Sequence, residues 1–399
     1  MIQLLLIAAS LGVEDLERMA LEANPSVRQA EAAVQAARGR EKQAGLYPNP
    51  VLGATGDEIA NGPVIRGGEH GGFFEQRIVT AGKLGASRNV AGREREAAEQ
   101  MSAAQKQRVR NAARMLFYQA LGDQRRVTVR AEVKRLADEA VKIAGELVNT
   151  GLGDQPDKLS AEIEAQRAEL SLVMARNAQE RTWRQIGALV NNPALRLSEL
   201  AGDLEALPKL DASVVLDRIY AESPEVRLSE IEASRAEMAV TRARKEPVPD
   251  IVVRGGVRYN RELLEANMRP VGREGFFDIG VEIPLFNRNQ GNIAAARAEA
   301  SKAKLDIDRT KLSLRARLAG ANREYQDAVA ASAKYKSEMI PRAEKAFGMY
   351  RENFRKMAVA YPMALNAQRN LAQLRDEYVD SLVMAWQRAV EMEGLLLLP

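Results

Sequence analysis

The pattern of apolar and polar positions is dominated by two long runs that are nearly free of proline. They span residues 82–149 and 291–357, and Pro341 is the only proline in either run. Apolar and small residues recur there at alternating steps of four and three, most clearly at Leu314, Leu318, Ala321, Tyr325 and Ala328. Such a seven-residue repeat keeps one seam of a helix facing its neighbour. The pattern predicts two coiled-coil helices of about 67 residues, each roughly 100 Å long, with a bend at Pro341.

Each long run ends at a turn and is followed by a shorter helical run. The first turn spans Thr150–Pro156 and the second spans Met357–Pro362. Glycine suits the end of a helix, and proline suits the first turn of the next one. We therefore predict returning helices over residues 157–190 and 363–396.

Short segments with partial period-two alternation lie between the helical runs. One hairpin is expected over residues 51–79 and another over residues 251–285. The predicted strands have the length of tilted membrane strands, although a hairpin in a soluble protein would give the same local pattern. Their limits are Val51–Ile59, Gly71–Val79, Ile251–Tyr259 and Phe276–Leu285.

The same order of elements occurs twice, at an offset of about 200 residues. Each half opens with a short helix that stops before a proline, because the residue preceding a proline is disfavoured in a helix. The matching segments include Glu22–Arg28 with Glu222–Arg227, and Gly72–Phe74 with Gly275–Phe277. The chain is therefore predicted to contain two homologous halves, residues 13–207 and residues 208–399.

Composition narrows the possible chemistry. The chain has no cysteine, which excludes disulfides, thiolate metal sites, a cysteine nucleophile and a lipid on an N-terminal cysteine. His70 is the only histidine, and in its glycine-rich loop a solvated side chain is favoured over a metal ligand. The net charge is only +4, and without a basic patch interleaved with aromatic residues nucleic acid is not an expected partner. No P-loop or dinucleotide motif occurs, so we predict no catalytic, cofactor or metal site and no enzymatic activity.

The N-terminal residues 1–12 form an apolar run that ends in small residues. This is the shape of a secretory signal peptide, but the positive segment that normally precedes the apolar run is missing. A signal-peptide remnant and an ordinary first turn of a helix are both open interpretations. No other apolar stretch reaches about 18 residues, so no transmembrane helix is predicted and a membrane crossing would have to use β-strands.

Several segments resemble one known family in their order and in their duplication. Leu46–Pro50 is similar to that family's entry into its first strand, and Gly280–Gly291 to its exit from the last strand into a long helix. Tyr361–Arg369, followed by Tyr378, is similar to its second inter-helix turn and returning helix. The chain resembles the TolC-type outer-membrane efflux proteins (outer-membrane factors) over residues 14–394, and most of all their heavy-metal efflux branch (CzcC/CusC-like).

The resemblance implies a mainly α-helical fold with a small membrane β-barrel portion. Four strands per chain would give a twelve-stranded barrel in a homotrimer, and the long coiled-coil helices would form an α-barrel tunnel through the periplasm. The protein would be a passive exit duct in the cell outer membrane, with heavy-metal cations as candidate cargo. Its partners would be outer-membrane lipid, a periplasmic membrane-fusion adaptor and an inner-membrane RND-type pump. The alternative function is a soluble periplasmic coiled-coil structural or adaptor protein.

Two groups of residues are predicted to face the membrane boundary or the cell exterior. Aromatic rings are enriched where membrane strands meet water, and packing in a soluble core is the alternative role for such rings. The loops Ala60–Gly68 and Asn260–Glu274 are expected outside the cell, because they are polar and lack apolar periodicity. The predicted aromatic band consists of Phe73, Phe74, Phe276 and Phe277.

The two turns after the long helices are predicted to dock the adaptor and to close the resting channel. Asp154 and Asp157 would form acidic rings at the periplasmic gate, with capping of the helix N-terminus as the alternative role. Both roles can coexist in one residue. The predicted docking residues are Gly151, Leu152, Gly153, Val359, Ala360, Tyr361 and Pro362.

Overall fold

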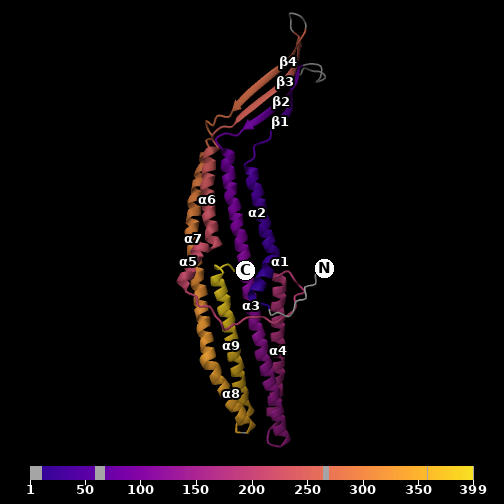
Figure 1. Ribbon diagram of the computed structural model, residues 1–399, viewed down its shortest axis with the longest axis vertical. Coiled ribbons are helices and arrows are strands. Elements are labelled where there is room, and N and C mark those ends of the chain that lie inside the picture. The colour runs from indigo at the N-terminus through magenta and orange to yellow at the C-terminus, as the bar shows by residue number, and fades with distance from the viewer. Residues whose placement is uncertain (1–10, 59–67, 264–268, 357, 399) are drawn as a thin grey trace. The chain divides into compact units, whose positions relative to one another are not determined.

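The computed structural model describes residues 11–58, 68–263, 269–356 and 358–398. Within them the chain is mainly helical and contains one four-stranded antiparallel sheet, as predicted (Figure 1). In the first half, the order is α1 (Val13–Ala23), α2 (Pro25–Ala44), β1 (Val51–Asp57), β2 (Glu69–Ile78), α3 (Lys83–Asn149) and α4 (Gln155–Leu189). In the second half it is α5 (Ala212–Glu222), α6 (Pro224–Lys245), β3 (Ile251–Leu263), β4 (Pro270–Val281), α7 (Gln290–Lys334), η1 (Tyr335–Met339), α8 (Ile340–Arg355) and α9 (Tyr361–Glu393).

The chain forms two compact units, and each unit draws on both halves of the sequence. The helical unit contains α1, α4, α5, η1, α8 and α9, together with the C-terminal parts of α3 and α7. The sheet unit contains β1–β4, most of α2 and α6, and the N-terminal parts of α3 and α7. The boundary on α3 follows Met101, and that on α7 follows Thr310. The predicted N-terminal run lies mostly outside the described residues.

The second long helix differs from the prediction of a single bent helix. A π-helical turn, η1, lies between α7 and α8 and ends two residues before Pro341. The amide of Ile340 donates to the carbonyl of Tyr335, one residue further back than in an α-helix. Proline has no N–H to continue the α-helical ladder, and a π-turn absorbs this change in hydrogen-bond register. The irregularity therefore lies one turn earlier than the proline that causes it.

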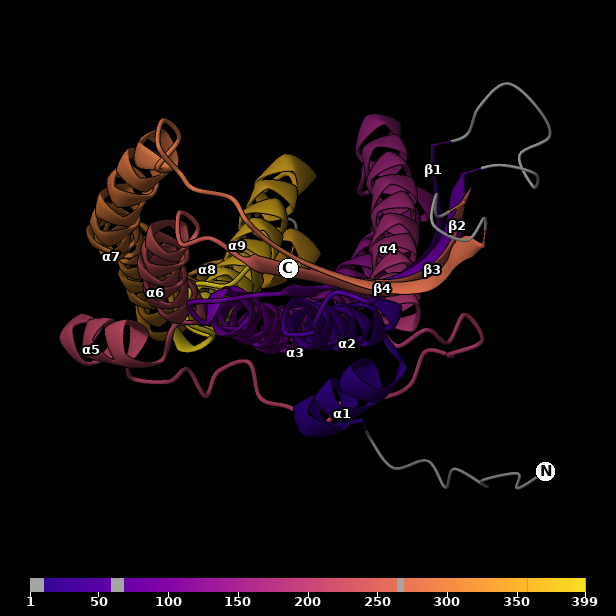
Figure 2. The same cartoon turned by 90° about the horizontal axis from the view of Figure 1, so that it is seen from above.

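The core of the helical unit joins the short helix α1 with the middle of α3 and the C-terminal parts of α4 and α9. Leu16 of α1, Phe117 of α3 and Ile186 of α4 belong to one cluster of buried apolar side chains, which also includes Leu382 of α9. Tyr118 stacks on Trp386, with 3.7 Å between the ring centroids. Figure 2, which views the helices nearly end-on, shows α8 and α9 beside one another, and these two helices pack closely. Large aromatic side chains therefore bind the long helices together where they meet the short ones.

Polar side chains satisfy the carbonyl groups near the C-terminus of α9. The buried Asn111 amide donates to the carbonyls of Gly394 at 3.0 Å and Leu397 at 2.7 Å. The guanidinium of Arg218 in α5 donates to the carbonyl of Glu393 at 3.0 Å. The last carbonyls of a helix have no partners within the helix, so these bonds hold the end of α9 in place.

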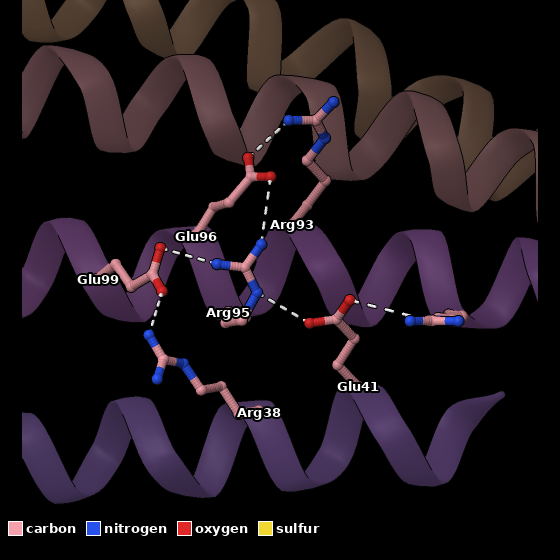
Figure 3. A network of polar contacts seen from close by, with 7 residues as sticks. Arg38, Glu41, Arg93, Arg95, Glu96 and Glu99 are labelled. Carbon is pink, nitrogen blue, oxygen red and sulfur yellow. Dashed lines mark hydrogen bonds and ion pairs between the residues drawn. The ribbon is translucent and has the colours of Figure 1, made fainter. Parts of the chain in front are cut away.

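In the sheet unit, a network of ion pairs links α2 with the first part of α3 (Figure 3). Arg95 contacts Glu99 and Glu41 at 2.8 Å each, and Arg38 contacts Glu99 at 3.2 Å. The hydrogen bond with Glu99, followed by that with Glu41, raises the pKa of Arg95, and the bond from Arg95 lowers the pKa of Glu99. Exposed pairs contribute only about 0–1 kcal/mol each, so this network orients the two helices more than it stabilises them.

The four strands pair in the order β1-β2-β3-β4, and every pairing is antiparallel (Figure 1). The central pairing joins β2 of the first half to β3 of the second half. The predicted limits of the second hairpin were wrong, since β3 extends to Leu263 and not to Tyr259, and β4 spans Pro270–Val281 and not Phe276–Leu285. Parts of the predicted exterior loop Asn260–Glu274 therefore belong to these two strands. Pro284 cannot donate to a sheet ladder, and the polar residues before Phe276 show no alternation even though they pair with β3. Among the described residues, no helix is long and apolar enough to span a membrane.

Candidate functional site

The sheet has two chemically different faces, because successive side chains on a strand point to opposite sides. One of them, the apolar face, leaves large side chains open to the surroundings. Val257 is 60% exposed and Phe277 is 66% exposed. The pairing register places on this face Leu52, Phe74, Ile78, Val253, Val257, Tyr259, Phe277, Ile279 and Val281.

The opposite side of the sheet, the polar face, carries most of the charged residues of the strands. Arg258 pairs with Glu69 at 2.5 Å and with Glu274 at 3.2 Å. The amide of the buried Asn260 also donates to Glu69, at 2.7 Å. The register places on this face the charged residues Asp57, Glu69, Glu75, Arg77, Arg254, Arg258, Glu274 and Asp278. A sheet with one apolar and one polar face is suited to stand between an apolar medium and water.

The four phenylalanines predicted as one band are divided between these faces. Phe74 and Phe277 lie on the apolar face, whereas Phe73 and Phe276 lie on the polar face. The ring of Phe73 occupies the space where Gly53 would have a side chain, and a Cβ on Gly256 would lie 2.7 Å from the ring of Phe276. The signal that separates the pairs is present in the sequence, since adjacent residues on a strand face opposite ways.

The sheet is attached to the helices of its own unit through Asp250. The backbone amide of Thr80 donates to this carboxylate at 3.1 Å, and the Lys83 ammonium contacts it at 3.0 Å. A cavity of 540 Å³ opens beside this junction. Its lining includes Arg77 and Val252, which belong to the polar face, together with Glu246 and Glu282. The polar face therefore continues into a hydrophilic hollow at the base of the strands.

The turn between α3 and α4 presents glycine backbone and one large apolar side chain, that of Leu152. Gly151 has a φ of +73°, a conformation that glycine adopts without strain. The amides of Leu152 and Gly153 both donate to the carbonyl of Leu147 at 2.9 Å. The Leu152 side chain is 61% exposed. The carboxylate of Asp154 accepts from the amide of Asp157 at 3.1 Å and thereby caps α4.

The turn between α8 and α9 is closed by a buried ring. Tyr361 is only 1% exposed, and its ring packs against Phe354 with the centroids 5.4 Å apart. Burial raises the pKa of Tyr361 to about 12, and no described residue accepts a hydrogen bond from its hydroxyl. Ala360 and Pro362 are exposed, whereas Val359 is half-buried. Of the predicted docking residues on this turn, Tyr361 is thus inaccessible in this conformation.

One apolar cluster joins the two helical hairpins near these turns. Ala144 of α3 and Ala161 of α4 pack with Tyr361, Ala364 and Phe354. Because small side chains line one side of the cluster, the helices approach closely around the Tyr361 ring. The structure therefore brings together the two turns that the sequence predicted separately.

Further from the two turns, ion pairs connect α3 with α9. The sequence analysis did not predict them. Arg130 pairs with Asp376, and Arg126 pairs with Asp380. Burial raises the pKa of Asp376 even though Arg130 acts in the opposite direction. The partners lie about 250 positions apart in the chain, so no local pattern could have matched them.

Comparison with known proteins decides the family. The family model for outer membrane efflux proteins matches residues 16–192 and 215–392. This chain belongs to the outer membrane efflux protein family. Membership confirms the resemblance seen in the sequence, and it confirms the prediction that the protein is not an enzyme.

Individual relatives include proteins of metal resistance. The chain is 27% identical to the cobalt-zinc-cadmium resistance protein CzcC of Cupriavidus metallidurans over 389 residues, which cover 98% of this chain and 90% of that protein. It is also 27% identical to the nickel-cobalt-cadmium resistance protein NccC of Alcaligenes xylosoxydans over 311 residues, which cover 74% of this chain and 66% of that protein.

Solved structures confirm the fold class. The chain superposes on CusC, whose structures concern transmembrane channel formation, with a TM-score of 0.79 at 16% sequence identity. The match covers 96% of this chain and 91% of the CusC chain. The outer membrane protein VceC of Vibrio cholerae superposes with a TM-score of 0.78 at 18% identity and covers 96% of both chains.

Proposed function

We propose that this family member is the outer-membrane channel of a tripartite efflux system and works as a passive exit duct. The two-faced sheet is the observation that carries the proposal. Its exposed apolar face suits lipid, and its polar face suits a water-filled lumen. Among the described residues β1 and β4 each keep one unpaired edge, and closure with the sheets of two further copies would remove these edges in a twelve-stranded barrel.

A homotrimer is further supported by an apolar stripe on α4. Side chains at coiled-coil spacing on this helix lie half to two-thirds exposed in the single chain. Contiguous exposed apolar surface on a helix is typical of a protein interface. The stripe consists of Leu159, Ile163, Leu170 and Met174, and we assign it to the contact with a neighbouring copy.

The proposed cargo is divalent heavy-metal cations, because two relatives are named for resistance to cobalt, cadmium, zinc or nickel. Energy would come from an inner-membrane RND-type pump through a periplasmic adaptor. The exposed Gly151, next to the half-buried Gly153, offers a close approach to an adaptor helix. Asp154 and Asp157 would add negative charge at the mouth of the closed channel, in addition to the capping bond that Asp154 makes.

The experiment that tests the channel compares arginine substitutions on the two faces of one strand. Val257 lies on the apolar face of β3, and Val252 lies on its polar face. We expect Val257→Arg to cost about 2–4 kcal/mol of stability in the membrane and to deplete the heat-modifiable trimer from outer-membrane fractions. The matched variant Val252→Arg keeps its charge in water and should assemble normally.

Fractionation of the wild-type protein separates this function from its alternative. A detergent-resistant trimer in the outer membrane supports the duct. Protein recovered only from the soluble periplasm, or equal tolerance of arginine at Val257 and Val252, contradicts the duct and favours a soluble coiled-coil protein.

A further inference from the structure

Two arginines on the polar face of β3 differ in how their charges are balanced. Arg258 is held between the carboxylates of Glu69 and Glu274. Arg254, four positions earlier on the same face, forms no ion pair with any described residue. Its cross-strand neighbours in the register are both acidic, Glu75 on β2 and Asp278 on β4. The Arg254 guanidinium thus has carboxylates on both neighbouring strands but pairs with neither.

Aromatic rings position the Arg254 guanidinium instead. Its central carbon lies 3.9 Å from the centroid of the Phe73 ring and 5.7 Å from that of the Phe276 ring. The face of an aromatic ring attracts a cation, and this attraction is well developed within about 6 Å. The Nε atom of Arg254 is buried and has no hydrogen-bond partner among the described residues. The guanidinium is therefore held by two rings and not by a carboxylate.

Two glycines create the room for this arrangement. Gly53 and Gly256 pair with Phe73 in the register, on the same face of the sheet. A side chain at Gly53 would collide with the Phe73 ring, and one at Gly256 would lie 2.7 Å from the Phe276 ring. Because both positions lack a Cβ, the rings lie over the backbone on either side of Arg254. The two phenylalanines, the two glycines and Arg254 form one unit, which we name the arginine bracket.

We propose that Arg254 determines the ion selectivity of the strand region, as a positive charge presented to solutes by the arginine bracket. The proposal rests on the proposed function, which makes the polar face the lining of an aqueous pore. Three copies of the bracket would then form a ring. Small anions gain from this charge and small cations are disfavoured by it, since rings of charged side chains set selectivity in pores.

The surroundings of the bracket fix the direction of the effect. Glu75 and Asp278 flank Arg254 and form no ion pair with any described residue. Loss of the Arg254 charge would leave these two carboxylates unopposed in each chain. The pore would then favour cations more strongly than the wild-type pore does.

Reversal potentials of purified trimers in a planar bilayer with a KCl gradient test this role. We expect Arg254→Gln to raise the permeability ratio of potassium to chloride by about 25-fold. Loss of one charge about 4 Å from an ion's path in water favours potassium by about fivefold and disfavours chloride by about fivefold. Arg254→Lys keeps the charge and should remain near the wild-type ratio. Phe73→Leu combined with Phe276→Leu frees the guanidinium to pair with Glu75 or Asp278, and its ratio should fall between those of the wild type and Arg254→Gln.

The matched control is Arg273→Gln, which removes the same charge from the opposite face of the same sheet. Its permeability ratio should equal that of the wild type. An equal shift in Arg273→Gln and Arg254→Gln would overturn the proposal, because total charge would then explain both. If the wild type conducts normally and Arg254→Gln leaves the permeability ratio unchanged, the role of Arg254 is overturned but the proposed channel is not. A wild-type protein that forms no conducting trimer overturns the proposed function as well.

Discussion

The two turns that end the helical hairpins occupy corresponding places in the repeat, yet they are built in opposite ways. The turn after α3 rests on Gly151 and Gly153, and its largest side chain, Leu152, lies in the open. The turn after α8 is closed by Tyr361, which is buried among the helices of both hairpins. One hairpin therefore ends in a glycine turn with an exposed side chain, and the other ends in a turn that anchors packing.

The difference is also seen in how each returning helix begins. The carboxylate of Asp154 caps α4, whereas Ala360 precedes α9 without any side-chain cap. A capping side chain replaces one of the missing backbone acceptors at a helix N-terminus. The first turn holds its helix by a local hydrogen bond, and the second holds its helix by tertiary packing. Substitutions in the two turns should consequently fail in different ways.

The largest effect is expected from removing the anchor of the second turn. Tyr361→Ala should lower the free energy of unfolding by about 3–5 kcal/mol, the usual cost of truncating a buried aromatic ring. Thermal unfolding of the detergent-solubilised protein, followed by helical circular dichroism, measures it. The control, Leu152→Ala, truncates an exposed side chain and should change stability by less than about 0.5 kcal/mol. Similar losses in both variants would abolish the contrast between the turns.

A smaller effect is expected from adding a methyl group to the first turn. A Cβ on Gly153 would lie 2.8 Å from the Cβ of Leu147, so Gly153→Ala should cost about 1–3 kcal/mol through overpacking. Metal export by cells that carry the pump and adaptor should also fall if the turn docks the adaptor. The control is Gly145→Ala on α3, where an added Cβ meets no atom within 4 Å. That change should stabilise the helix by about 0.5–1 kcal/mol, and a neutral Gly153→Ala would show that the turn is not tightly packed.

A third prediction concerns the N-terminal caps of α4 and α9, one of which is removed while the other is added. Asp154→Ala should cost about 1 kcal/mol because α4 loses its capping bond, and Ala360→Ser should recover a similar amount in α9. Unfolding free energies of the two variants and of their combination measure the exchange. Asp157→Ala removes a charge near the same helix end but no capping side chain, so its cost should be nearer 0.3 kcal/mol. Equal costs at Asp154 and Asp157 would show that charge alone matters there.

The smallest effect concerns the Tyr361 hydroxyl. Tyr361→Phe removes a buried group that has no described partner, so stability at neutral pH should stay constant or rise by up to about 1 kcal/mol. The pKa of Tyr361 is raised in the folded protein to about 12, above the value near 10 of a free tyrosine. The unfolded chain therefore loses this proton first, and the wild type should lose stability as pH rises from about 10 to 12.

The Phe variant lacks this contribution, so its stability should fall less over the same pH interval. Denaturant titrations of both proteins at several pH values measure the difference. Parallel pH profiles would mean that water reaches the hydroxyl in the folded protein, so that burial does not raise its pKa, and that the second turn is less closed than its packing indicates.

Sequence patterns predicted much of the fold because the interactions that form a helix are local in the sequence. The heptad spacing and the absence of proline predicted α3 to within a residue of its limits, and Pro25 and Pro224 marked where α1 and α5 end. A helix depends on residues three and four positions apart, which lie together in the sequence. The duplication and its soft motifs then identified the family that the comparisons confirmed.

Other features were decided by the tertiary structure alone, since their partners are distant in the chain. The pairing of β2 with β3 sets which residues of the two strands share a face, and it brings Arg254 close to the rings of Phe73 and Phe276. The burial of Tyr361 depends on Ala144 and Ala161, which lie about 200 residues away. Register and burial follow from how such segments pack against one another, because a side chain's environment is supplied by its neighbours in space and not by its neighbours in sequence.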